Sequence, residues 1–475
     1  MYGGNAQHSA QSSVASQALQ RILWTTPVDL APPYRAGGTL LIHYGSALVS
    51  GGNTVLVPVK TSSAGDFRVE ARAGSSGQLL WSLNSDYVLP ASGWTPSFNI
   101  ALSPSGRLYV PAAGGRLLWR DAVDQAGGTA QALAFYGNSP YAADPAAFNA
   151  SVRINTPLTV DAQGTVYFGF IAAAGNPAGL LSGIARVAAD GSGSWASARQ
   201  LAGDPAISKL AMNAAPALSA DGGTLYIAVN TETGTGTGYL LALNAATLAL
   251  KASQTLRTPQ SGQLARVSDS STASPTIGPD GDVFYGVLDS VLDAHNARGW
   301  LLHFDAALSQ QKTPGSFGWD DTPSIVPASA VPSYTGGSTY LLLVKYNNYY
   351  QLGSGNGLNK MAVLDPQAAQ ADFILPAVSV MKEVLTITGP TRDPETPGGM
   401  REWCVNTAVV DAQTQSALIN NEDGTLYRWD LRSNTLSEGI KLNDGLGQAY
   451  TPTMMGPDGV VYSINNAALH AVGKA

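Results

Sequence analysis

The stretch Ser274-Pro275-Thr276-Ile277-Gly278-Pro279-Asp280-Gly281-Asp282-Val283-Phe284-Tyr285 contains the pattern that decides the fold. A Ser/Thr-Pro step opens a short strand, an Asp-Gly turn follows, and a strand with a tyrosine comes next. Clear copies begin at Thr156-Pro157, Ala215-Pro216 and Thr451-Pro452, and weaker copies begin near Gly45, Asn99, Pro323 and Thr407. The pattern therefore predicts eight units, which start near residues 45, 99, 157, 216, 275, 323, 407 and 452.

An apolar strand that follows in each unit gives an independent count. Its copies are Phe67–Ala71, Arg116–Trp119, Gly183–Val187, Tyr239–Leu243, Trp300–Phe304, Lys360–Leu364, Thr425–Trp429 and Ala468–Val472. Apart from the longer sixth unit, the spacing of 45 to 59 residues suits a four-stranded propeller blade. The sequence thus predicts an all-β, eight-bladed β-propeller with four-stranded antiparallel blades, in one domain over residues 1–475.

The two ends of the chain indicate a closed ring rather than an open solenoid. The last unit ends after its third strand, and Gln20–Thr25 resembles the fourth strand of the first unit, Gln78–Ser82. We expect residues 19–30 to complete the last blade, which removes an exposed sheet edge.

Composition excludes several classes of function. Charged residues make up 12% of the chain, the net charge is −7, and no cluster of Lys and Arg offers a phosphate-binding surface, so we expect no nucleic-acid partner. No apolar run reaches the roughly 18 residues of a membrane-spanning helix. Cys404 is the only cysteine, which excludes an internal disulfide. We expect a monomer.

One segment resembles a known family. Ala73-Gly74-Ser75-Ser76-Gly77-Gln78-Leu79-Leu80-Trp81 is similar to the tryptophan-docking repeat of pyrroloquinoline-quinone (PQQ) propellers, although several other units lack the tryptophan. The opening Gly3–Ser9 resembles the mature start of such exported proteins. The resemblance implies a quinoprotein-like propeller, periplasmic or secreted once a leader is removed. That family includes dehydrogenases, an outer-membrane assembly scaffold and members of unknown role.

The resemblance leaves an enzyme and a binding protein open. A dehydrogenase of this family needs a quinone stacked on a tryptophan, a calcium ion, a catalytic aspartate and usually paired cysteines. The lone Cys404 cannot supply the pair, while Trp319-Asp320-Asp321 and Glu402-Trp403 could supply other parts, or could equally be turn caps and core residues. We therefore predict no cofactor and favour a non-catalytic scaffold, with a quinone- and calcium-dependent dehydrogenase of alcohols or sugars as the alternative.

Other polar residues have simpler interpretations. Asp289, Asp293, His295 and Asn296 could bind calcium through oxygen, or form a plain polar loop. His303 and His470 lie on apolar strands, so we expect them in the core.

The expected binding site lies where residues precede the first strand of each unit, at one mouth of the central channel. Residues 331–401 include a large insertion, which we expect on an end face of the ring. A glycan or peptide ligand would meet aromatic and polar side chains there, unless these belong to ordinary sheet surface. The candidate residues are Tyr346, Asn347, Tyr349, Asp320, Asp321, Glu402, Trp403 and Trp319.

Overall fold

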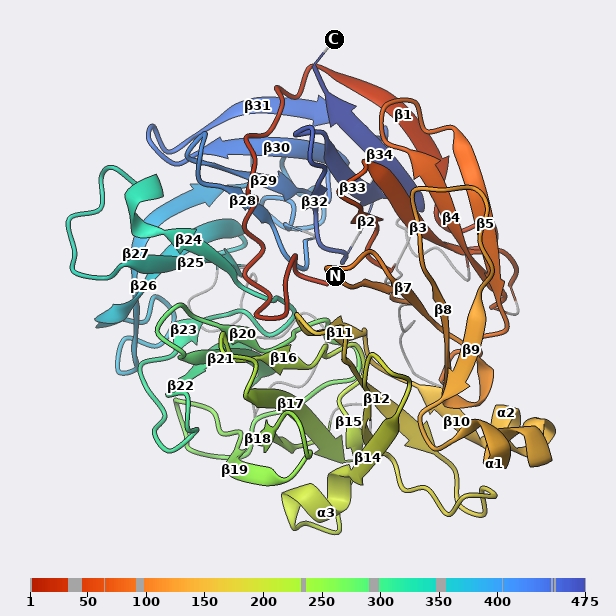
Figure 1. Cartoon of the computed structure of the whole chain (residues 1–475). Coiled ribbons are helices and arrows are strands. Elements are labelled where there is room, and N and C mark those ends of the chain that lie inside the picture. The colour runs from red at the N-terminus through yellow and green to blue at the C-terminus, as the bar shows by residue number, and fades with distance from the viewer. Residues whose placement is uncertain are drawn as a thin grey trace.

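The computed structural model describes residues 2–32, 45–63, 65–90, 98–231, 236–289, 299–346, 356–403, 405–445, 447 and 450–474. Eight antiparallel sheets surround a common centre, which confirms the eight-bladed propeller (Figure 1). The innermost strands follow one another around the centre, and the outermost strands form the rim.

The first four blades follow the chain in order from the inner to the outer strand. Blade 1 contains β2 (Leu48–Val49), β3 (Thr54–Lys60), β4 (Phe67–Ala73) and β5 (Leu79–Ser85). Blade 2 contains β6 (Ala101–Leu102), β7 (Leu108–Pro111), β8 (Arg116–Arg120) and β9 (Gln131–Ala134). Blade 3 contains β10 (Val152–Ile154), β11 (Thr159–Val160), β12 (Val166–Ala172), β13 (Gly183–Val187) and β14 (Gly193–Ser197). Blade 4 contains β15 (Ile207–Leu210), β16 (Ala217–Leu218), β17 (Thr224–Thr231), β18 (Gly238–Asn244) and β19 (Leu250–Thr255).

The other blades repeat this order. Blade 5 contains β20 (Thr276–Ile277), β21 (Val283–Leu288), β22 (Gly299–Phe304) and β23 (Gly315–Ser316). Blade 6 contains β24 (Ser324–Pro327), β25 (Tyr340–Tyr346), β26 (Lys360–Ala371) and β27 (Ser379–Thr388). Blade 7 contains β28 (Val409–Asp411), β29 (Ser416–Asn420), β30 (Thr425–Asp430) and β31 (Thr435–Lys441). Blade 8 contains β32 (Met454–Met455), β33 (Val461–Asn465), β34 (Ala468–Gly473) and β1 (Arg21–Pro27).

The ring closes as the sequence predicts. Strand β1 pairs antiparallel with β34, from Arg21 opposite Gly473 to Pro27 opposite Ala468. The N-terminal strand therefore supplies the outer strand of the last blade, and no open sheet edge remains between the two ends of the ring.

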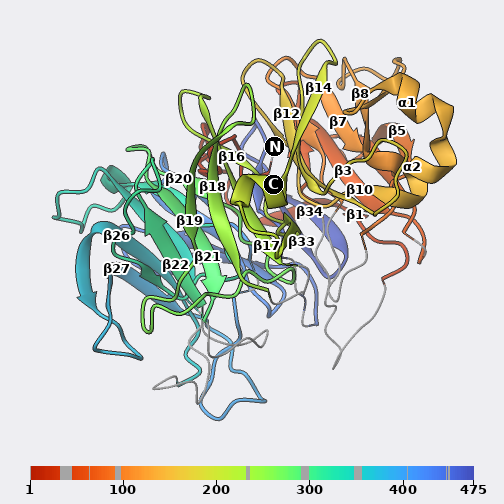
Figure 2. The same ribbon diagram turned by 90° about the horizontal axis from the view of Figure 1, so that it is seen from below.

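Short helices lie at the periphery. Helices α1 (Asn138–Ala143) and α2 (Pro145–Ser151) connect blades 2 and 3, and α3 (Ala198–Ala202) connects blades 3 and 4. Figure 2 shows α1 and α2 at the rim, away from the inner strands. Asp144 caps α2 by accepting the N–H of Ala147, and Pro145 occupies the first helical position. Two single 3-10 turns occupy Ala113–Gly115 and Ala328–Ala330.

Burial within each blade follows from strand position. Strand β3 lies second from the centre and is buried along its whole length, whereas β31 on the rim alternates exposed and half-buried residues. Inner strands lie between neighbouring blades, so both of their faces must be apolar. His303 and His470 are 1% and 5% exposed, which confirms them as core residues.

Part of the extra sequence of the sixth unit lies against blade 5. Residues 331–401 contain β25, β26 and β27, and the far end of the β26–β27 hairpin reaches the neighbouring blade. The Met381 N–H donates to the Pro314 carbonyl at 2.8 Å, and Val380 packs in the apolar cluster around Trp300. Because β23 has only two residues, the far end of this hairpin covers part of the rim of blade 5.

Candidate functional site

The N-terminal segment crosses the centre of the ring. We call residues 2–12 the arm; Figure 1 shows the N-terminus among the inner strands. At its start, the buried Tyr2 hydroxyl donates to the Thr272 carbonyl at 3.0 Å and contacts the Asn406 side chain. Burial raises the pKa of Tyr2 to about 12, so its hydroxyl remains protonated at neutral pH.

The arm pairs in turn with the inner strands of blades 4, 5, 6 and 7. One backbone N–H from each inner strand donates to a carbonyl of the arm. The pairs are Leu218 to Ala6 (2.8 Å), Ile277 to Gln7 (3.0 Å), Ile325 to Ser9 (2.9 Å) and Val410 to Ala10 (2.8 Å). The arm therefore binds four successive blades through backbone groups, which any extended peptide possesses.

Side chains also hold the arm in place. The Gln7 amide donates to the Leu218 carbonyl at 3.1 Å, and the Gln11 amide donates to the Ile325 carbonyl at 3.0 Å. His8 is fully buried, and its Nδ1–H donates to the Pro275 carbonyl at 2.7 Å, since a carbonyl can only accept. Burial lowers the pKa of His8 to about 4, so the ring is neutral at pH 7.

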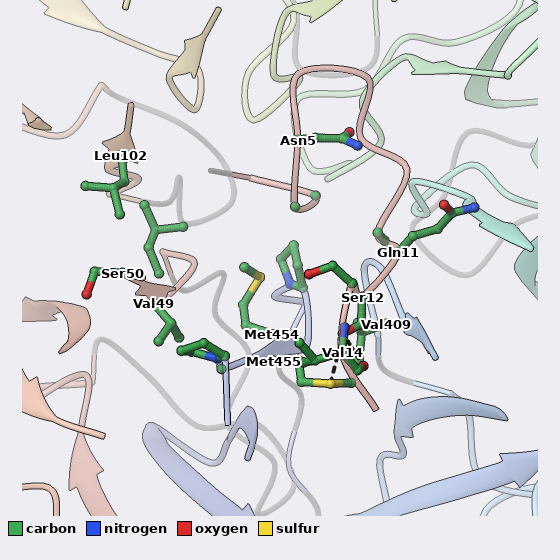
Figure 3. A pocket seen from close by; sticks show the side chains of 18 of the residues that line it. Asn5, Gln11, Ser12, Val14, Val49, Ser50, Leu102, Val409, Met454 and Met455 are labelled. Atoms are coloured by element: carbon green, nitrogen blue, oxygen red, sulfur yellow. Dashed lines mark hydrogen bonds between the residues drawn. The ribbon is translucent and has the colours of Figure 1, made fainter. Parts of the chain in front are cut away.

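A pocket of about 470 Å³ lies between the arm and blades 8, 1 and 2. In the described part of the chain, the arm reaches this side of the ring only at Ser12, whose hydroxyl lies 3.1 Å from the Met455 sulfur. Figure 3 shows Val49, Ser50 and Leu102 on one side of it and Ser12, Met454 and Met455 on another. Among the residues that line it are Asn5, Gln11, Val14, Val409 and Pro457. None of the described residues that line it carries a charge.

The pocket lies at the opposite end of the inner strands from the predicted site. Ser50, Ser103 and Gly456 line the pocket and follow the inner strands β2, β6 and β32. Asp320 and Glu402 instead precede β24 and β28. Since the inner strands of a propeller run in the same direction along its axis, these two groups lie at its two ends.

The structure separates the predicted site residues into two environments. Tyr346, Trp319 and Trp403 are at most 4% exposed, and their rings contact core side chains. Asn347 and Tyr349 lie outside the described residues.

The acidic members of the predicted set lie around Lys345; Asp320 and Asp321 are buried and Glu402 is half-buried. The Lys345 ammonium lies 3.6 Å from the Asp320 carboxylate, which also accepts hydrogen bonds from the Thr272 N–H and hydroxyl. The Asp321 carboxylate accepts the Lys345 backbone N–H at 2.7 Å, and burial raises its pKa well above the usual range. Burial and the neighbouring Glu422 raise the pKa of Glu402 to about 8.

Sequence reasoning identified neither the arm nor the pocket. The arm has no hydrophobic periodicity, and its contacts join residues far apart in the chain, such as Tyr2 and Asn406. One signal was Gly3, which has a φ of +60°, and where a Cβ would lie 2.9 Å from His8. A glycine pair at the start of a chain is, however, too common to predict such a packed turn.

Comparison with solved structures agrees with this architecture. A europium-containing methanol dehydrogenase superposes with a TM-score of 0.58 at 11% identity, over 97% of this chain and 88% of that one. The quinohemoprotein alcohol dehydrogenase from Comamonas testosteroni gives 0.58 at 12% identity, over 99% and 80%. The Saccharomyces cerevisiae protein Sqt1 gives 0.53 at 10% identity, over 97% and 100%. The chain has the same propeller fold as these proteins. No family model and no curated protein matches the sequence.

The residues of this propeller do not fit a quinone stacked at the candidate tryptophans Trp319 and Trp403. The Trp319 side chain lies where a side chain on Gly299 would stand, with 2.1 Å between the two Cβ positions, and it packs on Leu288. Trp403 is completely buried and packs edge-on against Tyr427. Neither ring presents an open face, and Asp320 is already bound by Lys345 and Thr272.

Other candidate positions can be placed in part. The Asp289 carboxylate accepts the Trp300 indole N–H at 2.7 Å, while Asp293, His295 and Asn296 lie outside the described residues. Within the described ranges, no three His, Cys, Asp or Glu side chains gather in a way that could hold a metal ion. Nor do those ranges contain a helix long and apolar enough to cross a membrane.

Proposed function

We propose that this propeller is an exported, non-catalytic binding scaffold whose ligand occupies the pocket beside the arm. The carrying observation is that the arm covers the inner strands of blades 4 to 7, whereas those of blades 8, 1 and 2 face a pocket of about 470 Å³. Ligand sites in proteins are typically concave, largely apolar and roughly 300 to 1,000 Å³ in volume.

The chemistry of the lining supports binding. Leu102, Val49 and Met455 offer apolar surface, while hydrogen bonds to Ser9 and Asp124 hold the Asn5 and Ser50 side chains in place. Methionine side chains adapt to ligands of different shape. The surrounding strands belong to a closed ring, so the site is held by a rigid frame.

Export and a monomeric state complete the proposal. Export rests on the resemblance of Gly3–Ser9 to the mature start of exported propellers. Fractionation of the cells that produce the protein would detect it in the periplasm or medium. Recovery only from the cytoplasm would contradict export, and light scattering would report the mass in solution.

Variants in which a tryptophan obstructs the pocket test whether the ligand binds there. Gly51 lines the pocket, has no left-handed φ, and would place a Cβ within 4 Å of nothing. Gly51→Trp should therefore fold normally and obstruct the pocket, and Leu102→Trp provides a second obstruction. Gly337→Trp is the matched control, because Gly337 is equally open and does not line this pocket.

The binding readout is a pair of arrays, one of glycans and one of eight-residue peptides. We expect the wild type and Gly337→Trp to bind the same array members, and both obstructed variants to lose at least tenfold in affinity for them. Binding that survives in both obstructed variants, or no binding to either array, would contradict a ligand site in this pocket.

A further inference from the structure

The arm shows how a peptide can occupy the centre of this ring. In blade 4, the Ser219 N–H donates to Thr224 at 2.9 Å within the hairpin, and the preceding Leu218 turns its N–H to the arm. Antiparallel pairing alternates in this way, so every second residue of an edge strand directs its N–H away from the sheet. Blade 5 repeats the arrangement with Gly278 and Ile277.

Blades 8, 1 and 2 have the same hairpin without a strand beside it. The hairpin bonds are Gly456 to Val460 (2.9 Å), Ser50 to Thr54 (3.0 Å) and Ser103 to Arg107 (2.9 Å). By the same alternation, the preceding residues Met455, Val49 and Leu102 direct their N–H groups away from the sheet. All three residues line the pocket, and no hydrogen bond from these N–H groups to another described residue is found.

The pocket presents a row of backbone N–H groups, so it favours a ligand that carries a row of carbonyl oxygens. The arm supplies such acceptors at residues 6, 7, 9 and 10, one for each blade that it crosses. Three of these four residues are small, namely Ala6, Ser9 and Ala10. The pocket contains no side chain to neutralise a charged ligand, and burying an unpaired charge is costly.

We infer that the pocket takes an uncharged peptide segment whose backbone carbonyls accept the N–H groups of Met455, Val49 and Leu102. The inference rests on the proposed binding function and names the chemical class of its ligand. The bound segment continues the pairing of the arm onto blades 8, 1 and 2, with one backbone hydrogen bond to the inner strand of each blade. Backbone pairing supplies affinity, and the apolar side chains of the pocket supply selectivity.

Proline substitution tests the role of the backbone donors directly. Leu102 pairs with Leu108 at a position where the ladder hydrogen bonds do not need the Leu102 N–H. Leu102→Pro therefore removes the proposed donor and spares the sheet, since proline is tolerated on edge strands. Leu102→Val is the matched control, because valine is similar in size to proline and retains the N–H. Val49→Pro and Val49→Ala form a second pair.

The probe is the eight-residue peptide array, which includes the arm sequence Asn5–Ser12, followed by fluorescence polarisation on the peptides that bind most tightly. We expect uncharged peptides to bind, and Leu102→Pro to weaken their Kd about three- to tenfold relative to Leu102→Val, as the loss of one hydrogen bond implies. Melting temperatures of each pair show whether the proline variant is folded; if one is not, the other pair decides.

Different results would overturn different statements. If the folded proline variant and its control bind peptides with equal affinity while Gly51→Trp does not bind them, backbone pairing is contradicted and the pocket remains the site. If only glycans bind the wild type, and Gly51→Trp no longer binds them, a peptide ligand is contradicted and the pocket remains the site. If peptides or glycans bind Gly51→Trp and Leu102→Trp as tightly as the wild type, the proposed function itself is contradicted.

Discussion

The indole Nε1 of Trp24 donates a 2.7 Å hydrogen bond to the carbonyl oxygen of Gly74. This bond joins the last blade, completed by β1, to the turn between β4 and β5 of the first blade. A second tryptophan repeats the contact one blade further on, because the Trp81 indole donates to the Val123 carbonyl at 2.8 Å. The docking segment identified in the sequence therefore lies beside the place where the ring closes.

Gly77→Ala should weaken this closure. A Cβ at Gly77 would lie 2.6 Å from the Trp24 ring, and the residue has a φ of +71°. Gly222→Ala is the control, since Gly222 has a φ of +69° and nothing within 4 Å of its Cβ position. We expect Gly222→Ala to lower the free energy of unfolding by about 1 kcal/mol through backbone strain alone, and Gly77→Ala by about 2–4 kcal/mol. Equal losses in urea denaturation would show that Trp24 docking adds nothing to closure.

Tyr2→Phe should loosen the arm. Removing the hydroxyl deprives the buried Asn406 side chain and Thr272 carbonyl of a partner, at a cost of about 1–3 kcal/mol. Hydrogen exchange at Leu218 and Ile277, whose N–H groups bind the arm, should accelerate. Tyr239→Phe, which removes a half-buried hydroxyl bonded to Asp204, is the control and should leave those two amides unchanged. Unchanged exchange in Tyr2→Phe would mean that Tyr2 does not anchor the arm.

Stability should fall at acidic pH partly through His8. Its pKa is about 4 in the folded protein because it is buried, whereas an unfolded histidine has a pKa near 6.5. Between these values the unfolded chain binds the extra proton, so the free energy of unfolding decreases as the pH falls from 6.5 to 4, by up to about 3 kcal/mol. His8→Asn keeps a donor for the Pro275 carbonyl and suits the φ of +58° at this position. Its urea denaturation curves should depend less on pH than those of the wild type; parallel curves would contradict a buried neutral His8.

Glu402→Gln should stabilise the protein at alkaline pH. The pKa of Glu402 is raised to about 8 by burial and by Glu422, so the folded state retains a proton that the unfolded state releases above pH 4.5. The wild type therefore loses stability as the pH rises from 4.5 to 8, by up to about 1.4 kcal/mol per unit, and the glutamine variant avoids this loss. Glu395→Gln, an exposed position in the preceding segment, is the control. A stability difference between Glu402→Gln and wild type that stays constant from pH 5 to 8 would contradict the raised pKa.

Trp403→Ala should destabilise the fold rather than report on binding. Trp403 is completely buried in the apolar cluster of blades 6 and 7, so the cavity left by alanine should cost about 3–5 kcal/mol. Tyr346→Ala should also be severe, because Tyr346 is 1% exposed and packs edge-on against Phe317. Thermal unfolding checks both; a melting temperature within a degree or two of wild type would contradict their place in the core.

The candidate site shows where inference from sequence stops. Asp320, Asp321 and Glu402 were singled out by their position before the inner strands, and the structure does gather them around Lys345. The side chains of Trp319, Trp403 and Tyr346, however, turn into the blades, because large aromatic surfaces gain most from burial. A position in the repeat predicts the end of the ring on which a residue lies, but not the direction of its side chain.

By itself, the sequence determined the number of blades, the order of their strands and the closure by residues 19–30, within which β1 pairs with β34 over residues 21–27. These features depend on short, repeated patterns, since each blade forms from neighbouring segments and buries its faces against the next. Only the tertiary structure decided the course of the arm and the pocket beside it. The arm contacts blades 4 to 7 through backbone groups, which every residue carries. No pattern of side chains could therefore predict those contacts.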